Sequence, residues 1–72
     1  MKDTKVRSSF IESVGYDSDI KDLRIRMLND SEYVYHAVPK EIYEGILIAK
    51  SKGIYFRQNI MTRYKCERLE KI

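Results

Sequence analysis

A stretch near the C-terminus combines positive charge with aromatic rings and contains no acidic residue between Glu44 and Glu67. Lys and Arg side chains neutralise phosphate groups, and aromatic rings stack on bases. Basic residues interleaved with aromatic ones therefore suit a surface that binds nucleic acids or nucleotides. The candidate ligand-binding residues are Lys50, Lys52, Tyr55, Arg57, Arg63, Tyr64 and Lys65.

The same residues also fit structural roles. Tyr55 and Tyr64 stand near helical spacing, which is equally typical of residues that pack in a core. Lys50 and Lys52 stand where basic side chains often interact with the C-terminal dipole of a helix. Both interpretations remain open at the level of the sequence.

The net charge of +3 is unevenly distributed along the chain. Residues 1–39 contain six basic and seven acidic side chains, whereas residues 40–72 contain eight basic and four acidic ones. A local basic block points to an anionic partner more strongly than the overall charge does.

The residues that could support catalysis do not form a recognisable pattern. His36 is the only side chain expected to titrate near neutrality without help, and the potential nucleophiles Ser8, Ser9, Ser51 and Cys66 lack a known signature. One cysteine and one histidine do not suffice for a structural zinc site, and there is no glycine-rich phosphate loop. We expect no enzymatic activity, no metal and no cofactor.

With 72 residues, the chain is expected to form a single domain. A domain of this size buries only about 60% of the surface of its unfolded chain, so self-association remains open as a source of stability. The sequence has no apolar run long enough to span a membrane and no signal-peptide pattern at its start. We therefore expect a cytoplasmic protein without a membrane partner.

Alternating apolar residues predict strands at about residues 10–16, 23–27 and 33–35, separated by turns at 17–19 and 29–31. Short connections require these strands to pair antiparallel, and the strand near residues 10–16 is expected to lie at an edge. A helix is expected from Pro39 to a left-handed cap at Gly53, where Lys50 and Lys52 would lie in the last turn. A second helix is expected from about Tyr55, with residues 66–72 extending it or fraying.

These patterns predict an α+β fold, in which an antiparallel meander of three or four strands is followed by one or two helices packed on one face. Gly45 interrupts the first helix, where either a close packing contact or a ligand would explain it. The predicted core consists of Val14, Leu23, Ile25, Met27, Val38, Ile42, Ile46, Leu47, Ala49, Phe56 and Ile60.

A series of short motifs stands at characteristic spacing over residues 6–64. They are Ser8-Ser9, Val14-Gly15-Tyr16-Asp17, Leu23-x-Ile25, Tyr33-x-Tyr35, Val38-Pro39, Tyr43, Ala49-x-Ser51-x-Gly53-x-Tyr55-Phe56 and Ile60. This pattern resembles the KTSC domain, a family named after its occurrence at the C-terminus of some lysyl-tRNA synthetases. The resemblance implies a domain core at about residues 6–64 with a C-terminal tail at 65–72. It also implies strands followed by helices, no enzymatic activity and, through the attachment to a synthetase, contact with RNA.

The sequence departs from the family pattern at three positions. Asp30 replaces a glycine that is usual in the hairpin, Arg57 replaces a frequent asparagine, and Met61 replaces a frequent arginine. The last replacement removes a positive charge from a position next to Ile60, and Arg63 is the nearest basic residue that follows.

The sequence thus favours a small non-catalytic module that binds a phosphate-bearing ligand, with RNA or another nucleic acid first. The alternative is a phage or mobile-element protein that binds and inhibits a host protein, or that sequesters a signalling nucleotide as an oligomer. Six tyrosines suit a protein interface. The salt dependence of binding distinguishes a nucleic-acid ligand from a protein partner, because phosphate contacts weaken steeply as the salt concentration rises.

Overall fold

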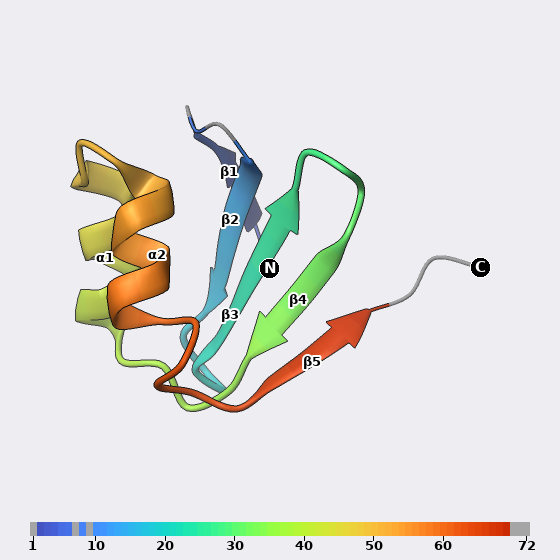
Figure 1. The fold of residues 1–72 in the computed structure, drawn as a ribbon. Helices are drawn as coiled ribbons and strands as arrows, with labels where there is room; N and C mark the ends of the chain where they lie inside the picture. The colour runs from blue at the N-terminus through green and yellow to red at the C-terminus, as the bar shows by residue number, and fades with distance from the viewer. Residues whose placement is uncertain (1, 7, 9, 70–72) are drawn as a thin grey trace.

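The computed structural model describes residues 2–6, 8 and 10–69. Within these residues the chain forms a five-stranded antiparallel sheet in the order β1-β2-β3-β4-β5, and two helices lie on one side of it (Figure 1). The elements are β1 (Lys2–Lys5), β2 (Ile11–Asp17), β3 (Asp22–Met27), β4 (Glu32–Tyr35), α1 (Lys40–Ile48), α2 (Lys52–Asn59) and β5 (Cys66–Leu69). The predicted α+β class is confirmed, although the sheet has more than the three or four strands expected.

The central strands form where the apolar alternation predicts them. Leu23 and Ile25 of β3 are fully buried, whereas Arg24 between them is partly exposed. Val14 of β2 pairs with Ile25 and is also fully buried. Since successive side chains of a strand point to opposite faces, one face of β2 and β3 packs on the helices and the other carries the arginines.

Asx-type hydrogen bonds close the two hairpin turns. Asp17 Oδ1 accepts a hydrogen bond from the Asp19 N–H at 3.0 Å, and Asn29 Oδ1 accepts one from the Ser31 N–H at 3.0 Å. Asp30 has a φ of 68°, in the left-handed region where glycine carries no steric cost. This backbone conformation explains why the family that the sequence resembles usually has a glycine there.

A bulge explains why Glu12 interrupts the apolar pattern of β2. Ile11 pairs with Met27 and Ser13 pairs with Arg26, so Glu12 is an extra residue on its strand. A bulge sets two residues against one and shifts the alternation by one position. As a result Ile11 and Val14, three positions apart, pair with Met27 and Ile25 on the same face of β3, and both are fully buried.

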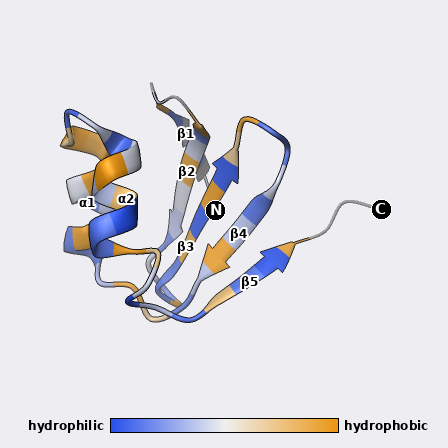
Figure 2. Ribbon diagram, viewed as in Figure 1, coloured by the Kyte–Doolittle hydropathy of each residue, from blue (hydrophilic) through white to orange (hydrophobic). Residues whose placement is uncertain are grey.

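The two outer strands differ from the prediction. The strand near residues 10–16 is not an edge, because β1 pairs with its outer side. Cys66 and the residues after it neither extend a helix nor fray through residue 69, because β5 pairs antiparallel with β4. All four side chains of β5 are exposed, and the middle of this strand is hydrophilic in Figure 2, so no apolar alternation marks it in the sequence. Residues 70–72 of the predicted tail lie outside the described residues.

The boundary between the helices also differs from the prediction. The first helix ends at Ile48 rather than at Gly53, and the second begins at Lys52 rather than at about Tyr55. Gly53 therefore lies in the first turn of α2, and its φ is outside the left-handed region. A different constraint explains this glycine, since a Cβ atom there would lie 2.5 Å from Phe10 Cε1.

The core lies between the sheet and the helices and is close to the predicted set. It consists of Ile11, Val14, Leu23, Ile25, Tyr35, Val38, Ile46, Phe56 and Ile60. Four predicted core residues are only partly buried, namely Met27, Ile42, Leu47 and Ala49. Ile11 and Tyr35 were absent from the predicted core; Tyr35 packs edge-to-face on Phe56, with ring centroids 5.6 Å apart. None of the helices in the described part of the chain is long and apolar enough to cross a membrane.

Two isoleucines of α1 provide a matched test of this packing. Ile46 is fully buried and Ile48 is 85% exposed, two positions apart on the same helix. We expect Ile46→Ala to lower the free energy of unfolding by about 2–5 kcal/mol, because it removes buried methyl groups and leaves a cavity. Ile48→Ala should change it by less than about 0.5 kcal/mol. Urea unfolding followed by circular dichroism measures both, and equal losses would contradict the described position of α1.

Candidate functional site

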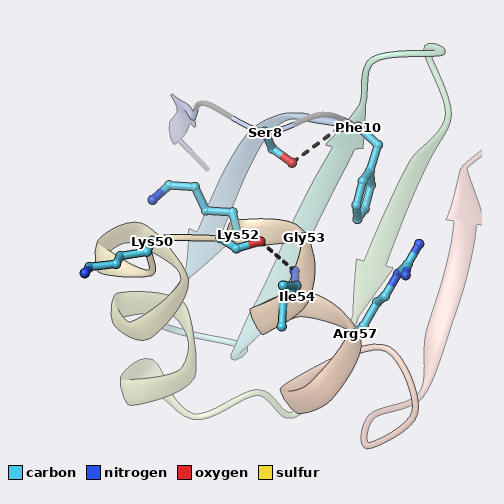
Figure 3. A pocket seen from close by; sticks show the side chains of 8 residues that line it. Ser8, Phe10, Lys50, Lys52, Gly53, Ile54 and Arg57 are labelled. Atoms are coloured by element: carbon cyan, nitrogen blue, oxygen red, sulfur yellow. Dashed lines mark hydrogen bonds between the residues drawn. The ribbon is translucent and has the colours of Figure 1, made fainter.

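A pocket of about 470 Å³ opens where α2 begins, next to the segment that leads into β2 (Figure 3). It is lined by Ser8, Phe10, Lys50, Ser51, Lys52, Gly53, Ile54 and Arg57. Three of these side chains are basic, and none of the lining residues within the described chain is acidic. The pocket therefore presents positive charge together with hydroxyl groups and one aromatic ring.

The first turn of α2 supplies part of this positive character through its backbone. Ser51 caps the helix, because its Oγ accepts a hydrogen bond from the Ile54 N–H at 3.3 Å and its carbonyl accepts one from the Tyr55 N–H at 3.0 Å. The first N–H groups of a helix have no partner within the helix, and the aligned peptide dipoles leave partial positive charge there. This end of α2 lines the pocket and favours an anion.

Phe10 lines the pocket directly beside the helix terminus. Its ring lies against the backbone of Gly53 and packs edge-to-face on Phe56, with centroids 6.3 Å apart. Ser8 Oγ accepts hydrogen bonds from the Phe10 N–H at 3.4 Å and the Ile11 N–H at 3.3 Å, which fix the segment before β2. The guanidinium carbon of Arg57 lies 5.6 Å from the centroid of the Phe10 ring, within reach of a cation–π contact.

Three of the seven predicted ligand-binding residues line this pocket, and their side chains differ in availability. Arg57 is exposed and extends toward Phe10, whereas Lys50 is exposed and extends away from that ring (Figure 3). Lys52 is half-buried, and its Nζ donates hydrogen bonds to the carbonyls of Leu47 at 3.2 Å and Ala49 at 2.6 Å. Lys52 thus neutralises the C-terminal end of α1, although it is not in the last turn of that helix.

The other four predicted residues do not line this pocket. Arg63 Nε donates to the Gln58 carbonyl at 3.2 Å, and the Lys65 carbonyl accepts a hydrogen bond from the His36 N–H at 2.9 Å. Tyr55 and Tyr64 are half-buried and pack against the core. A role of these four residues in ligand binding stays a prediction, and it would have to involve a surface other than this pocket.

Tyr55 also explains the glycine in the middle of α1. A Cβ atom on Gly45 would overlap the Tyr55 ring, with Cζ only 2.6 Å away, so a close packing contact accounts for this position. Burial raises the pKa of the Tyr55 hydroxyl, and the neighbouring Tyr64 raises it further.

Five pocket residues were not among the ligand-binding residues predicted from the sequence, although two of them, Ser8 and Ser51, had been considered as nucleophiles. They are Ser8, Phe10, Ser51, Gly53 and Ile54. Ser8 and Phe10 are more than forty positions from Ser51 along the chain. Nothing in the local pattern of either segment indicates that they meet, although Ser8, Ser51 and Gly53 belong to the motifs shared with the KTSC family.

His36 lies away from this pocket and links β4 to β5. Its Nδ1 is 2.9 Å from Asp22 Oδ1, and its Nε2 is 3.3 Å from Glu67 Oε1 in an ion pair without hydrogen-bond geometry. The hydrogen bond to Asp22 raises the pKa of His36 above its usual 6.5, partial desolvation lowers it, and the charges of Asp22 and Glu67 raise it further. Since Glu67 belongs to β5, this cluster helps to hold the outer strand in place.

The described residues contain no group of three or more His, Cys, Asp or Glu side chains placed to hold a metal ion. Ser8 and Ser51 accept backbone hydrogen bonds, and Cys66 is exposed on β5. Ser9 lies outside the described residues.

Comparison with known proteins places this architecture in context. A family model described as the KTSC domain matches residues 7–64. The crystal structure of a KTSC domain protein from Yersinia pestis is 32% identical and has a TM-score of 0.92, covering 96% of this chain and 97% of that one. A protein of Tsukamurella paurometabola is 33% identical over 60 residues, which span 83% of this chain and 90% of that protein. A lysine–tRNA ligase of Trichormus variabilis is 35% identical over 65 residues, which span 90% of this chain but 12% of the ligase.

The His36 cluster predicts a specific dependence of stability on pH. Because the folded state raises the pKa of His36, its stabilising contribution is fully present below about pH 6.5 and is lost as the pH rises through the folded pKa. We expect the melting temperature to fall over this window in the wild type and to change less in His36→Gln. His36→Gln keeps every other titratable group of the chain, so the difference between the two profiles reports His36 alone. Thermal melts from about pH 6 to 8 measure the effect, and parallel profiles would contradict it.

Proposed function

The chain belongs to the KTSC domain family, and we propose that it is a non-catalytic binding module for a phosphate-bearing ligand, with RNA as the first candidate. The observation that carries the proposal is the pocket at the start of α2. It joins a helix N-terminus to exposed Arg57 and Lys50 and to the hydroxyls of Ser8 and Ser51.

Arg57 is the main phosphate ligand in this proposal. A guanidinium donates several hydrogen bonds in a planar fork that matches two phosphate oxygens. The Phe10 ring beneath it restricts the orientation of the side chain, so less conformational entropy is lost on binding. Lys50 adds long-range attraction, whereas Lys52 contributes less because its ammonium group already bonds to the end of α1.

The lining of the pocket supports binding rather than catalysis. A general base must reach the proton that it abstracts, and the described lining contains no imidazole and no carboxylate. His36, the residue best suited by type, is engaged by Asp22 and Glu67.

The choice of RNA is supported by association. The lysine–tRNA ligase of Trichormus variabilis, a protein whose name states action on a tRNA, contains a segment similar to 90% of this chain. A shared domain does not carry function by itself, so this similarity ranks the ligands for testing.

One observation favours a protein partner or a second copy of this chain as the rival proposal. β5 is at the edge of the sheet and its four side chains are all exposed, so its outer backbone groups are available for pairing with another strand. Such pairing relies on backbone hydrogen bonds and is expected to persist at moderate salt, unlike phosphate contacts. It would also accommodate an oligomer that sequesters a nucleotide.

Fluorescence anisotropy with labelled tRNA, single-stranded RNA and duplex DNA tests the proposal at about 50 and 200 mM salt. We expect salt-sensitive binding that Arg57→Ala weakens about 10-fold or more, because a charge-assisted hydrogen bond is lost. Lys40→Ala is the charge-matched control, since Lys40 is the exposed first residue of α1, about 12 Å along the helix from Ile48 at the end that leads to Lys50.

Two results would contradict the assignment of the site. The first is no binding by the wild type at the lower salt. The second is an equal loss in Lys40→Ala and Arg57→Ala, which would indicate attraction by overall charge rather than a pocket.

A further inference from the structure

A second pocket, of about 360 Å³, adjoins the first at Phe10. Phe10 lines both pockets, and the second is completed by Met27, Leu28, Asn29 and Tyr33. Its chemistry differs from that of the first pocket, because the side chains are apolar or aromatic except for the Asn29 amide. Both volumes fall in the range typical of small-molecule sites.

Each of the two aromatic rings in the second pocket has an arginine close to it. Arg57 Cζ lies 5.6 Å from the Phe10 centroid, and Arg68 Cζ lies 6.0 Å from the Tyr33 centroid. An apolar pocket whose two aromatic rings each lie near a cation is complementary to a ligand that combines a flat apolar group with negative charge. A purely apolar peptide or lipid chain would leave both guanidinium groups without a counter-charge.

The fold fixes the walls of this second pocket. The Leu28 N–H donates to the Phe10 carbonyl at 2.8 Å, which joins the β3–β4 turn to the segment before β2. Tyr33 is directly opposite Ile25 in the sheet register, so its ring lies on the face that carries the core. Leu28 is nevertheless 55% exposed, which places a large apolar side chain at the rim of the pocket.

We infer that the two pockets form one site for an unpaired nucleotide, whose phosphate lies at the start of α2 and whose base lies between Phe10 and Tyr33. This inference rests on the proposed function of the first pocket. The base must be unpaired, because a base within a duplex has both faces covered by its neighbours. Aromatic rings stack on any of the bases. In this site the side-chain amide of Asn29 is a hydrogen-bond partner for the edge of the base.

A free nucleotide and one residue of single-stranded RNA share this chemistry. The test therefore uses four ligands: a single-stranded RNA of about ten nucleotides, an RNA duplex, a nucleoside monophosphate, and ribose 5-phosphate, which has no base. Binding is followed by shifts of the backbone amide signals of residues 51–54, which report the phosphate pocket for weak and strong ligands alike.

We expect Tyr33→Leu to weaken binding of the single-stranded RNA about 5- to 150-fold, the range that corresponds to one lost base stack, and to leave ribose 5-phosphate unaffected. Arg57→Ala should weaken both ligands. Because Tyr33 contacts the core, Leu28→Ala is a second variant on an exposed side chain, with the same selective loss. Ile20→Ala is its control, since Ile20 is also exposed and apolar but lines neither pocket.

The outcomes separate this inference from the proposed function. Weaker RNA binding by both Tyr33→Leu and Leu28→Ala supports the inference. If the nucleoside monophosphate binds as tightly as the single-stranded RNA, a free nucleotide is also identified as a ligand of this site. If Tyr33→Leu and Leu28→Ala bind the RNA as tightly as the wild type, while Arg57→Ala binds it more weakly, the assignment of the base to the second pocket is wrong. The proposed phosphate site in the first pocket then still stands. If the RNA duplex binds as tightly as the single strand, the inference that an unpaired base lies in the second pocket is also contradicted. If no ligand shifts the amides of residues 51–54, both proposals fail.

Discussion

The ring of Phe10 lies so close to the backbone of Gly53 that a Cβ atom at position 53 would come within 2.5 Å of it. This contact holds the first turn of α2 against the segment before β2. The same ring packs on Phe56, lies beneath Arg57 and lines both pockets. Protein interiors are close-packed, so a side chain added at Gly53 would displace the ring and alter both pockets together.

The short connection between the helices creates the electrostatic character of the first pocket. α1 ends at Ile48 and α2 begins at Lys52, so a negative helix end and a positive one lie close together along the chain. Lys52 donates to the last carbonyls of α1, which offsets the negative end. In the proposed site, the positive end of α2 and the side chain of Arg57 attract the phosphate without that competing dipole, and exposed Lys50 adds positive charge nearby.

Aromatic residues have two separate roles in this small domain. Tyr55 packs on Gly45 and Tyr64 packs on the core, so these rings contribute to stability. Phe10 and Tyr33 line a pocket and each has an arginine nearby. In the proposed site the stacking surface therefore comes from outside the basic stretch at residues 50–65, which supplies the charge.

Local patterns in the sequence were sufficient to predict the α+β class, the three central strands, their Asx turns and much of the core, because alternation and turn chemistry act over a few residues. The resemblance to the KTSC family also came from the sequence and was confirmed by the family match. Among the predicted ligand-binding residues, Lys50, Lys52 and Arg57 were found in the pocket because charge clusters there along the chain as well as in space.

Tertiary structure alone decided the remaining features. β1 and β5 form because neighbouring strands offer them a ladder, while their own four-residue sequences carry no apolar alternation. Gly53 resembles a helix cap in the sequence, but it is required by the approach of Phe10, a residue 43 positions away. The site depends on contacts between segments that are distant in the chain, and such contacts leave no periodic signal in either segment.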